Sequence, residues 1–342
     1  PEAPDLHALL AVGLERGVDA VVMEVSSHAL ALGRVGGVHF AVGGFTNLGV
    51  DHLDFHTDLA DYFAAKAKLF DGRCDIEIIN VDGEAGSRLL SPRSQRYAGP
   101  GGPEADWYPT DVAADGYGTR FVVHGPGGLT VRAGVGLPGR HNVANAVLAV
   151  ATLVAVGVDP ATAGAAVAGC TGAPGRMERV PGGHGVTGVV DYAHKPDAVA
   201  EVLAALRGMV SGDGRVICVI GAGGDRDRGK RPLMGAAAAG GADLVIVTDD
   251  NPRTEPPVRI RAEVLAGTTG PEARADVVEV AGRREAVAVA VAAARPGDVV
   301  ALLGKGHERG QEVAGEVFEF DDRVELAAAF RAAAGSRAGG AR

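Results

Sequence analysis

The sequence predicts an α/β fold with about two domains, and three observations indicate this class. The second half alternates short apolar runs with helical segments, which is typical of a parallel sheet covered by helices. The first half combines helical spacing with buried-strand runs and then a stretch of short β runs. A length of 342 residues suffices for about two domains with proper hydrophobic cores.

The first half contains two runs that predict buried strands, 18–25 and 38–45, among segments with the apolar spacing of helices. Between Ile76 and Leu137, short β runs separated by Gly and Pro turns predict a hairpin-rich sheet. The predicted helices are 5–16, 59–70, 142–156 and 160–168.

The second half begins after a stretch dense in turn residues, 173–183, which indicates a domain boundary. We expect a first domain at 1–178, a second at 179–334 and a frayed tail at 335–342. The strands predicted for the second domain are 188–191, 215–220, 243–247, 277–280 and 298–303.

Composition excludes several classes of protein. The formal net charge is −10 and the sequence pI is near 5.5, so no basic surface is expected for nucleic acid. Cys74, Cys170 and Cys218 lack the paired spacing of a zinc site or a disulfide framework. No apolar run is long enough to span a membrane, and we expect a soluble, cytoplasmic protein.

The run from Thr248 to Arg253 follows an apolar strand and contains two acids, an amide, a proline and an arginine. Open α/β sheets place their ligands at such strand ends. Pro252 fixes its own φ and keeps Asn251 extended, so Asp250, Asn251 and Arg253 would present an acceptor, an amide and a bidentate donor together. This set matches a zwitterion, although an ordinary solvated turn has the same composition.

The glycine-rich segment 221–230 is similar to two nucleotide-binding patterns and completes neither. The third glycine of the dinucleotide fingerprint falls on Arg226, and the hydroxyl residue of a phosphate loop falls on Arg231. We interpret the segment as a charged loop in which Arg226 and Arg228 face an anionic group, with a helix beginning at Pro232.

Two predicted strand ends in the first half carry residue types that bind metal ions. Glu24 is followed by two serines and His28, and the segment 47–56 contains two acids and two histidines. At neighbouring strand ends, these side chains would form one site. Ser26 or Ser27 is alternatively a simple helix cap.

Lys66 lies on the apolar face of the helix predicted at 59–70, four residues after Tyr62 and four before Phe70. Desolvation favours the neutral form of an amine, which can react with CO₂ to give a carbamate that binds Mg²⁺. A lysine whose ammonium reaches past the apolar face into water, as we expect for Lys68, is the alternative.

Nine short motifs together resemble the Mur ligase family, most closely its members that add diaminopimelate, and the resemblance covers essentially the whole chain. Each motif is weak alone, but nine in the family order are specific. They are E-V-S-S-H at 24–28, D-H-L-D-F-H at 51–56, A-A-K at 64–66, G-R-H-N-V-A-N at 139–145, P-G-R-M at 174–177, V-D-Y-A-H-K-P at 190–196, G-G-D-R-D at 223–227, D-N-P-R at 250–253 and G-K-G-H-E at 304–308.

The resemblance implies roles for residues in the first half. Glu24 and His52 match the positions that hold Mg²⁺, and Lys66 matches a carbamylated lysine that supports a second metal. Ser26 and Arg34 match contacts to the UDP-muramoyl-dipeptide. Leu32 stands where the family often has glutamine, so that contact is not expected here.

The resemblance also implies two groups of contacts further along the chain. The implied ATP contacts are Asn142, Arg176, Asp191 and His194. The implied contacts to meso-diaminopimelate are Arg226, Asp250, Asn251, Pro252, Arg253, Gly304 and Glu308.

The fold implied by the resemblance is a truncated, P-loop-type Mur ligase central ATPase domain followed by a C-terminal Rossmann-like α/β domain. The family has a UDP-binding domain and a G-T-x-G-K-T phosphate loop, and neither precedes Pro1, which is not an initiator methionine. We therefore expect a fragment that cannot carry out the ligation on its own, because the main cradle for ATP phosphates is missing.

The activity implied is an ATP-dependent amide ligase of peptidoglycan biosynthesis, which adds meso-2,6-diaminopimelate to UDP-N-acetylmuramoyl-L-alanyl-D-glutamate through an acyl phosphate. Metal ions and Arg176 would neutralise the transferring phosphoryl group. Arg253 would select diaminopimelate by pairing with its far carboxylate, which lysine lacks. The alternatives are a folylpolyglutamate synthase-like ligase and a non-catalytic module that binds diaminopimelate.

Overall fold

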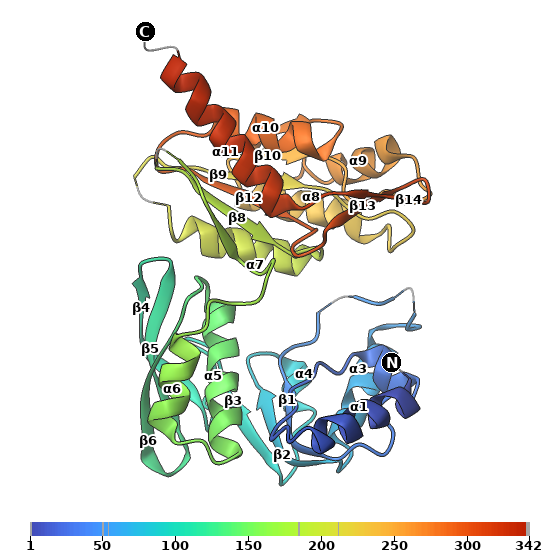
Figure 1. The fold of residues 1–342 in the computed structure, drawn as a ribbon, viewed down its shortest axis with the longest axis vertical. Helices are drawn as coiled ribbons and strands as arrows, with labels where there is room; N and C mark the ends of the chain where they lie inside the picture. The colour runs from blue at the N-terminus through green and yellow to red at the C-terminus, as the bar shows by residue number, and fades with distance from the viewer. Residues whose placement is uncertain (1, 50, 54, 184, 211, 340–342) are drawn as a thin grey trace. The chain divides into compact units, whose positions relative to one another are not determined.

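A computed structural model of the chain describes residues 2–49, 51–53, 55–183, 185–210 and 212–339 (Figure 1). The chain divides into two compact units. Unit 1 comprises Pro1–Ala113, Arg120–Gly134 and Val143–Gly169, and unit 2 comprises Ala114–Thr119, Val135–Asn142 and Cys170–Arg342.

Unit 1 contains a parallel three-stranded sheet of order β1-β2-β3, formed by β1 (Phe40–Phe45), β2 (Cys74–Asn80) and β3 (Ser94–Tyr97). Apolar residues of β1 and β2, such as Phe45 and Ile79, form one buried cluster with Leu89. The helices around this sheet are α1 (Ala3–Glu15), α2 (Ser27–Ala31), α3 (Leu59–Ala67) with the 3₁₀ turn η1 (Lys68–Phe70), and α4 (Glu84–Ser87).

The strand predicted at 18–25 is wrong. These residues form no strand, and Val22 is 97% exposed. An apolar run becomes a strand only when a neighbouring backbone completes its hydrogen bonds, and no described strand pairs with this run. The prediction relied on the apolar composition of this run alone.

The hairpin-rich region predicted between Ile76 and Leu137 contains a second three-stranded sheet of order β4-β5-β6. Its strands are β4 (Tyr108–Asp115), β5 (Gly118–Gly125) and β6 (Leu129–Val135), with a short 3₁₀ turn η2 (Pro126–Gly128) between the last two. The helices α5 (Arg140–Ala155) and α6 (Pro160–Ala168) follow at the predicted positions.

Unit 2 is built on a six-stranded sheet of order β11-β10-β9-β12-β8-β7, in which only β7 runs antiparallel. All five predicted strands are present. The strands are β7 (Glu178–Pro181), β8 (Thr187–Asp191), β9 (Val216–Ile220), β10 (Leu244–Val247), β11 (Asp276–Glu279) and β12 (Val299–Leu303).

Helices cover both faces of this sheet (Figure 1). One buried cluster joins one face of the strands to the first three helices of the unit, and a second cluster joins the opposite face to the last two. The five helices are α7 (Pro196–Arg207), α8 (Lys230–Gly241), α9 (Pro257–Leu265), α10 (Arg283–Ala293) and α11 (Asp322–Gly339).

The neighbouring strands β9 and β12 lead to helices on opposite faces, because α8 follows β9 and α11 follows the loops after β12. Such a switch point opens a crevice at the carboxyl ends of the strands, where open α/β sheets bind ligands. The loops that start at Gly221, Thr248 and Gly304 all lie at this edge.

Three details of unit 2 differ from the predictions. The hairpin of β13 (Gly310–Val313) and β14 (Glu316–Glu319) was not predicted, because its strands are short, contain few apolar residues and remain partly or fully exposed. Helix α8 begins at Lys230 rather than Pro232. The tail predicted to fray from 335 is helical through Gly339, and 340–342 lie outside the described residues.

Candidate functional site

In unit 1, the first turn of α2 and the loop that ends near His56 come together, as predicted from their two motifs. The His28 ring lies 4.8 Å from the His52 ring and 4.1 Å from the Phe55 ring, measured between centroids. Tyr62 of α3 lies 5.7 Å from His52, and the Lys66 ammonium lies 5.3 Å from the Tyr62 ring. The segments thus converge on one cluster, while their role stays a prediction.

A buried hydrogen-bond chain that sequence reasoning missed supports this cluster. The His56 ring, 3% exposed, lies with Nε2 3.0 Å from Ser27 Oγ and Nδ1 3.2 Å from Asp61 Oδ2. A backbone bond from Thr57 and the contact with His56 lower the pKa of Asp61. His56 therefore ties α2, the His52 loop and α3 together.

The remaining predicted residues of unit 1 are less enclosed. Glu24 is exposed, and Ser26 caps α2 by accepting a hydrogen bond from the Ala29 N–H at 3.1 Å. Arg34 pairs with Glu2 at 2.9 Å. Leu32, at the departure from the family pattern, is 53% exposed.

The metal-binding prediction was tested against the donor groups. Among the described residues, no three His, Cys, Asp or Glu side chains are placed to hold a metal ion together. His52 Nε2 lies 3.2 Å from Asp51 Oδ2, so this imidazole is already in contact with a carboxylate. Mg²⁺ commonly takes only one or two protein ligands and completes its coordination shell with water and phosphate oxygens. The predicted donors Glu24 and His52 fit only such a site with few protein ligands. Val50 and Asp54 lie outside the described residues.

In unit 2, the residues predicted to contact ATP gather around the end of β8. Asp191 is 5% exposed, and its two oxygens accept the backbone N–H groups of Met177 and Ala193, both at 2.7 Å. Burial raises the pKa of this carboxyl against the opposing effect of those hydrogen bonds. His194 lies with Nδ1 2.7 Å from the Tyr192 carbonyl.

Arg176 and Asn142 are the other two residues predicted to contact ATP. The exposed Arg176 guanidinium lies over the Tyr192 ring at 4.8 Å. Asn142, at the start of α5, donates from Nδ2 to the Pro138 carbonyl at 2.7 Å. A flat aromatic ring with an exposed cation above it, beside a fixed carboxylate, suits a nucleotide with its phosphates.

The predicted amino-acid pocket lies at the carboxyl ends of β9, β10 and β12. Asp250 and Asn251 follow β10 and are both 7% exposed, and Glu308 Oε2 accepts a hydrogen bond from Asn251 Nδ2 at 2.7 Å. Pro252 is also buried. Gly304 follows β12 with φ of 113°, and a Cβ there would lie 2.5 Å from Asp250 Oδ2. Glycine at 304 therefore lets the two strand ends approach each other.

Arg253 closes the run after β10. Its backbone adopts the left-handed region with φ of 51° and pairs with the β13 strand, donating to the Glu312 carbonyl at 3.0 Å. The guanidinium donates from Nη1 to the Gly224 carbonyl at 2.7 Å, and its Nε lies 3.3 Å from Glu312 Oε2. Because a guanidinium has five N–H groups, these contacts leave donors for a ligand carboxylate.

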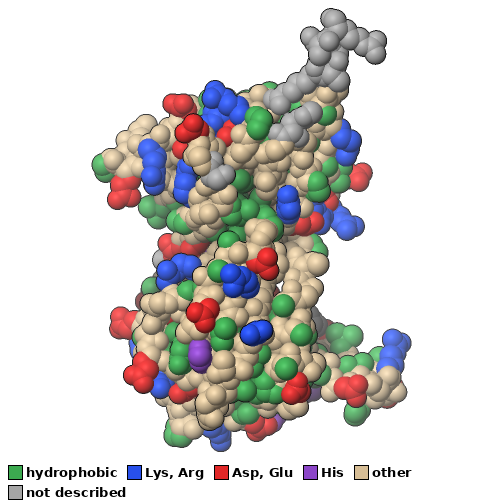
Figure 2. Space-filling view, turned by 90° about the vertical axis from the view of Figure 1, so that its left-hand side faces the viewer, with side chains coloured by type: hydrophobic (Ala, Val, Ile, Leu, Met, Phe, Trp, Pro, Cys, Tyr) green, Lys and Arg blue, Asp and Glu red, His purple; other side chains and the backbone are tan. Residues whose placement is uncertain are grey.

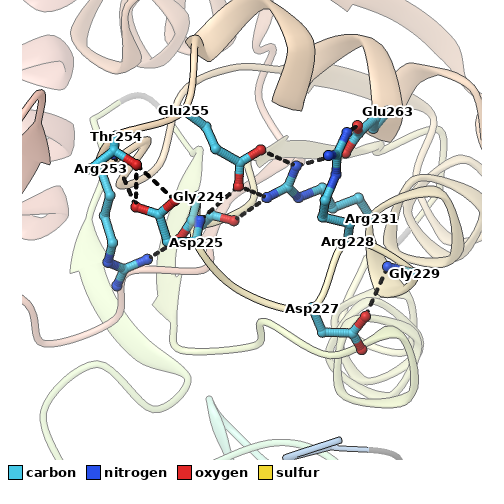
Figure 3. A network of polar contacts seen from close by, with 11 residues as sticks. Gly224, Asp225, Asp227, Arg228, Gly229, Arg231, Arg253, Thr254, Glu255 and Glu263 are labelled. Atoms are coloured by element: carbon cyan, nitrogen blue, oxygen red, sulfur yellow. Dashed lines mark hydrogen bonds and ion pairs between the residues drawn. The ribbon is translucent and has the colours of Figure 1, made fainter. Parts of the chain in front are cut away.

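A charged network braces the loop after β9 against the loop after β10, and Figure 3 shows its side chains converging. Arg231 has no exposed side-chain surface and bonds to Glu255 at 2.7 Å, to Glu263 at 2.6 Å and to the Gly223 carbonyl at 3.0 Å. The predicted anion-binding residue Arg228 instead pairs with Glu263. Arg226 is exposed at the edge of the same loop.

This network also holds Asp225 in place. Its N–H donates to Glu255 Oε1 at 2.7 Å, and its carboxylate accepts the Thr254 N–H at 3.0 Å and the Thr254 hydroxyl at 2.9 Å (Figure 3). The pKa of Glu255 is lowered to about 2, first by the hydrogen bond from Arg231 and then by that from the Asp225 backbone. Positions 224 and 252 are in direct contact as well, since a Cβ at Gly224 would lie 1.9 Å from the Pro252 carbonyl.

Backbone strain is concentrated in the predicted site segments. Non-glycine residues rarely adopt positive φ, and such residues cluster at functional sites. Among the described residues, four of the six examples, namely His52, Met177, Asp225 and Arg253, lie within the motifs assigned to metal, ATP or amino-acid binding. The other two are Asp111 and Ala314.

Acidic and basic side chains are interspersed on the face drawn in Figure 2. Among the helices of the described residues, none has both the length and the apolar character needed to cross a membrane.

Comparison with known proteins gives two family matches. Residues 1–153 match the family described as the Mur ligase middle domain, and residues 175–306 match the Mur ligase, glutamate ligase domain. The first matched region contains the cluster of unit 1, and the second contains the predicted amino-acid contacts from Arg226 to Gly304 but not Glu308.

Curated relatives are similar over nearly the whole chain. UDP-N-acetylmuramoyl-L-alanyl-D-glutamate–2,6-diaminopimelate ligase of Streptomyces avermitilis is 48% identical, with 95% of this chain and 65% of the relative covered. The protein of the same name from Corynebacterium glutamicum is 49% identical, with coverages of 96% and 65%. The chain thus spans slightly less than two thirds of the length of these relatives.

A solved structure of a ligase with this name is similar in fold and sequence. It is 36% identical with a TM-score of 0.65, and the alignment covers 98% of this chain and 69% of that one.

Proposed function

The chain belongs to the Mur ligase family, and we propose that it serves an ATP-dependent ligation that joins meso-2,6-diaminopimelate to UDP-N-acetylmuramoyl-L-alanyl-D-glutamate in peptidoglycan assembly. Two curated relatives at 48% and 49% identity carry the name of that ligase. The proposal extends their named activity to this chain on the basis of its own pocket.

The position of Arg253 is the observation that supports this proposal most strongly. Its guanidinium lies 3.3 Å from Glu312 Oε2, and the other predicted contacts Asp250 and Glu308 follow the strands β10 and β12, so cationic and anionic side chains meet at these strand ends. An amino-acid end with an ammonium and a carboxylate complements this set. Diaminopimelate has such an end at both termini, whereas lysine has a bare amine at one. Lysine would leave the guanidinium without its carboxylate, which costs affinity.

The groups for ATP and Mg²⁺ are proposed from the residues present. Asn142, Arg176, Asp191 and His194 would hold ATP, and Glu24 and His52 would hold Mg²⁺. When bound, Mg²⁺ supplies positive charge that offsets the phosphate oxygens. Lys66 is proposed as a carbamate that adds a negative oxygen ligand, which its half-buried position beside Tyr62 supports. An increase in the mass of the peptide that contains Lys66, after incubation in bicarbonate, tests this modification.

The reaction needs no protein nucleophile. The γ-carboxylate of the D-glutamyl residue attacks the terminal phosphorus of ATP and ADP leaves, which gives an acyl phosphate. The diaminopimelate amine then attacks the carbonyl carbon and phosphate leaves as the amide forms. Positioning and charge neutralisation dominate such phosphoryl transfers, and the exposed guanidinium of Arg176 would supply positive charge to the phosphates. Ser26 and Arg34 would contact the UDP-muramoyl-dipeptide.

Titration calorimetry tests the amino-acid part of this proposal. The chain should bind meso-diaminopimelate and bind L-lysine about tenfold or more weakly, because one charge-assisted bidentate pair is lost. Arg253→Ala should remove most of this preference. Arg259→Ala, an exposed arginine on α9, is the matched control and should leave it unchanged. Equal affinity of the wild-type chain for both amino acids would contradict the assignment of the pocket.

A further inference from the structure

Lys305, directly after β12, is a fully buried ammonium whose side chain has no exposed surface. Its Nζ donates to Asn251 Oδ1 at 3.0 Å, to Glu308 Oε2 at 3.2 Å and to the Gly310 carbonyl at 2.7 Å. A lysine ammonium has three N–H groups, so each has an acceptor. Buried charges persist only when paired and hydrogen-bonded in this way.

These bonds fix the two pocket side chains that Lys305 touches. Asn251 Oδ1 also accepts the Glu312 N–H at 3.0 Å, so its amide oxygen faces two donors and its Nδ2 is turned to Glu308. Glu308 Oε2 therefore receives two donors. Within the described part of the chain, the one hydrogen bond to its Oε1 comes from the Tyr192 hydroxyl, at a long 3.4 Å.

We propose that Lys305 is a positioning residue of the amino-acid pocket, which holds Asn251 and Glu308 so that Glu308 Oε1 is left to accept the ammonium of the bound amino acid. This inference rests on the proposed function. Lys305 does not touch the amino acid, and it acts through the orientation of the carboxylate.

Charge balance supports the same role. The predicted pocket residues and their ion-pair partners include three carboxylates, Asp250, Glu308 and Glu312, against the cations Arg253 and Lys305 and the exposed Arg226. Removal of Lys305 would leave Glu308 free to turn and would add net negative charge next to the ligand carboxylate. Both effects weaken binding of a zwitterionic end.

A double-mutant cycle tests the inference, with the dissociation constant for meso-diaminopimelate measured by calorimetry on the 342-residue chain. Lys305→Met and Glu308→Gln should each weaken binding about tenfold or more, because each removes a charge-assisted contact or its orientation. The double variant should be about as weak as either single one, because both changes disable the same contact. Lys68→Met, at an exposed lysine, is the control and should bind as the wild type does.

The outcomes separate this inference from the proposed function. No binding by the wild-type chain overturns the proposed function and this inference with it. Unchanged affinity of Lys305→Met, or losses that multiply in the double variant, overturn only the role of Lys305, since a general structural defect would add to the loss of Glu308.

A measurement on the wild-type chain covers the case in which Lys305→Met does not fold. The side-chain ammonium of Lys305, observed by nitrogen-15 NMR in a lysine-labelled chain, should shift when meso-diaminopimelate saturates the pocket, because Glu308 then shares its charge with a second cation. Saturation without any change in this signal would overturn the inference.

Discussion

Arg231 is buried behind the pocket loops, where it bonds to two carboxylates and a carbonyl. Removing one partner of a buried ion pair is costly because the remaining charges lose their compensation. We predict that Arg231→Met lowers the free energy of unfolding by about 2–4 kcal/mol in urea titrations, toward the low end because Glu255 and Glu263 can reach water.

The control for this prediction is Arg284→Met, which breaks the pair with Glu325 at a position where the arginine is 65% exposed. Such a surface pair contributes less than about 1 kcal/mol. Similar losses for both variants would show that Arg231 is an ordinary surface charge in energetic terms.

The lowered pKa of Glu255 predicts a pH dependence of stability. Its folded-state pKa of about 2 lies below the ordinary value of 4.5, so its stabilisation is fully present above about pH 5 and is lost as the pH falls toward 2. Unfolding free energies measured between these pH values should fall less steeply in Glu255→Gln than in the wild type. Parallel curves for the two proteins would contradict the assignment.

At the scale of single residues, the sequence alone could predict that polar residues adjacent in the chain lie together. It could not predict side-chain contacts between segments that are distant in the chain. Asp250, Asn251 and Arg253 stand together in the sequence after an apolar strand, so their shared location followed from strand topology. Lys305 could not be assigned in this way, because its acceptors come from residues 251, 308 and 310 and meet only in the folded sheet. The pairing of Arg228 with Glu263 could not be predicted either, because the two residues are distant in the chain.

At the level of helices and strands, local apolar pattern was sufficient where an element has a paired or packed neighbour. Each of the five predicted strands of the six-stranded sheet is present, because each pairs with at least one neighbouring strand of that sheet. The run 18–25 has equally apolar residues and no strand, whereas the β13–β14 hairpin forms although its few apolar residues, Val313, Val317 and Phe318, are partly or fully exposed. Pairing rather than composition decided both cases.

Helix α3 carries Lys66, and its start depends on one cap. The Asp58 carboxylate accepts the Asp61 N–H at 2.8 Å. Asp58→Ala should destabilise α3 by about 1 kcal/mol, seen as faster amide hydrogen exchange in 59–67. Asp159→Ala, which removes the equivalent cap of α6, should speed exchange in 160–168 and leave α3 unchanged. Unaltered exchange in α3 after Asp58→Ala would show that tertiary packing, not this cap, sets its start.

Over the whole molecule, each unit has its own buried clusters, and the functional residues divide between the units. The proposed metal ligands lie in unit 1, and the proposed ATP and amino-acid contacts lie in unit 2. The α/β class and the Mur ligase family followed from the sequence because strand order and motif order are both recorded along the chain. Side-chain networks between distant segments are not recorded there.

The pocket in unit 2 predicts a selective effect of ligand on stability. A ligand at 100 times its dissociation constant stabilises the folded protein by about 2.7 kcal/mol when only the folded state binds it. Meso-diaminopimelate should therefore slow hydrogen exchange in the core strands β9 and β12, and L-lysine at the same concentration should slow it much less. Equal protection by the two amino acids would show that the pocket does not recognise the second carboxylate.

A crystal structure of this chain grown with meso-diaminopimelate would show directly where the amino acid binds. We predict a ligand at the carboxyl ends of β9, β10 and β12, with one of its carboxylates on the Arg253 guanidinium and one of its ammonium groups on Glu308 Oε1. A ligand bound away from these strand ends, or bound there with Arg253 paired only to Glu312 and Gly224, would contradict the account.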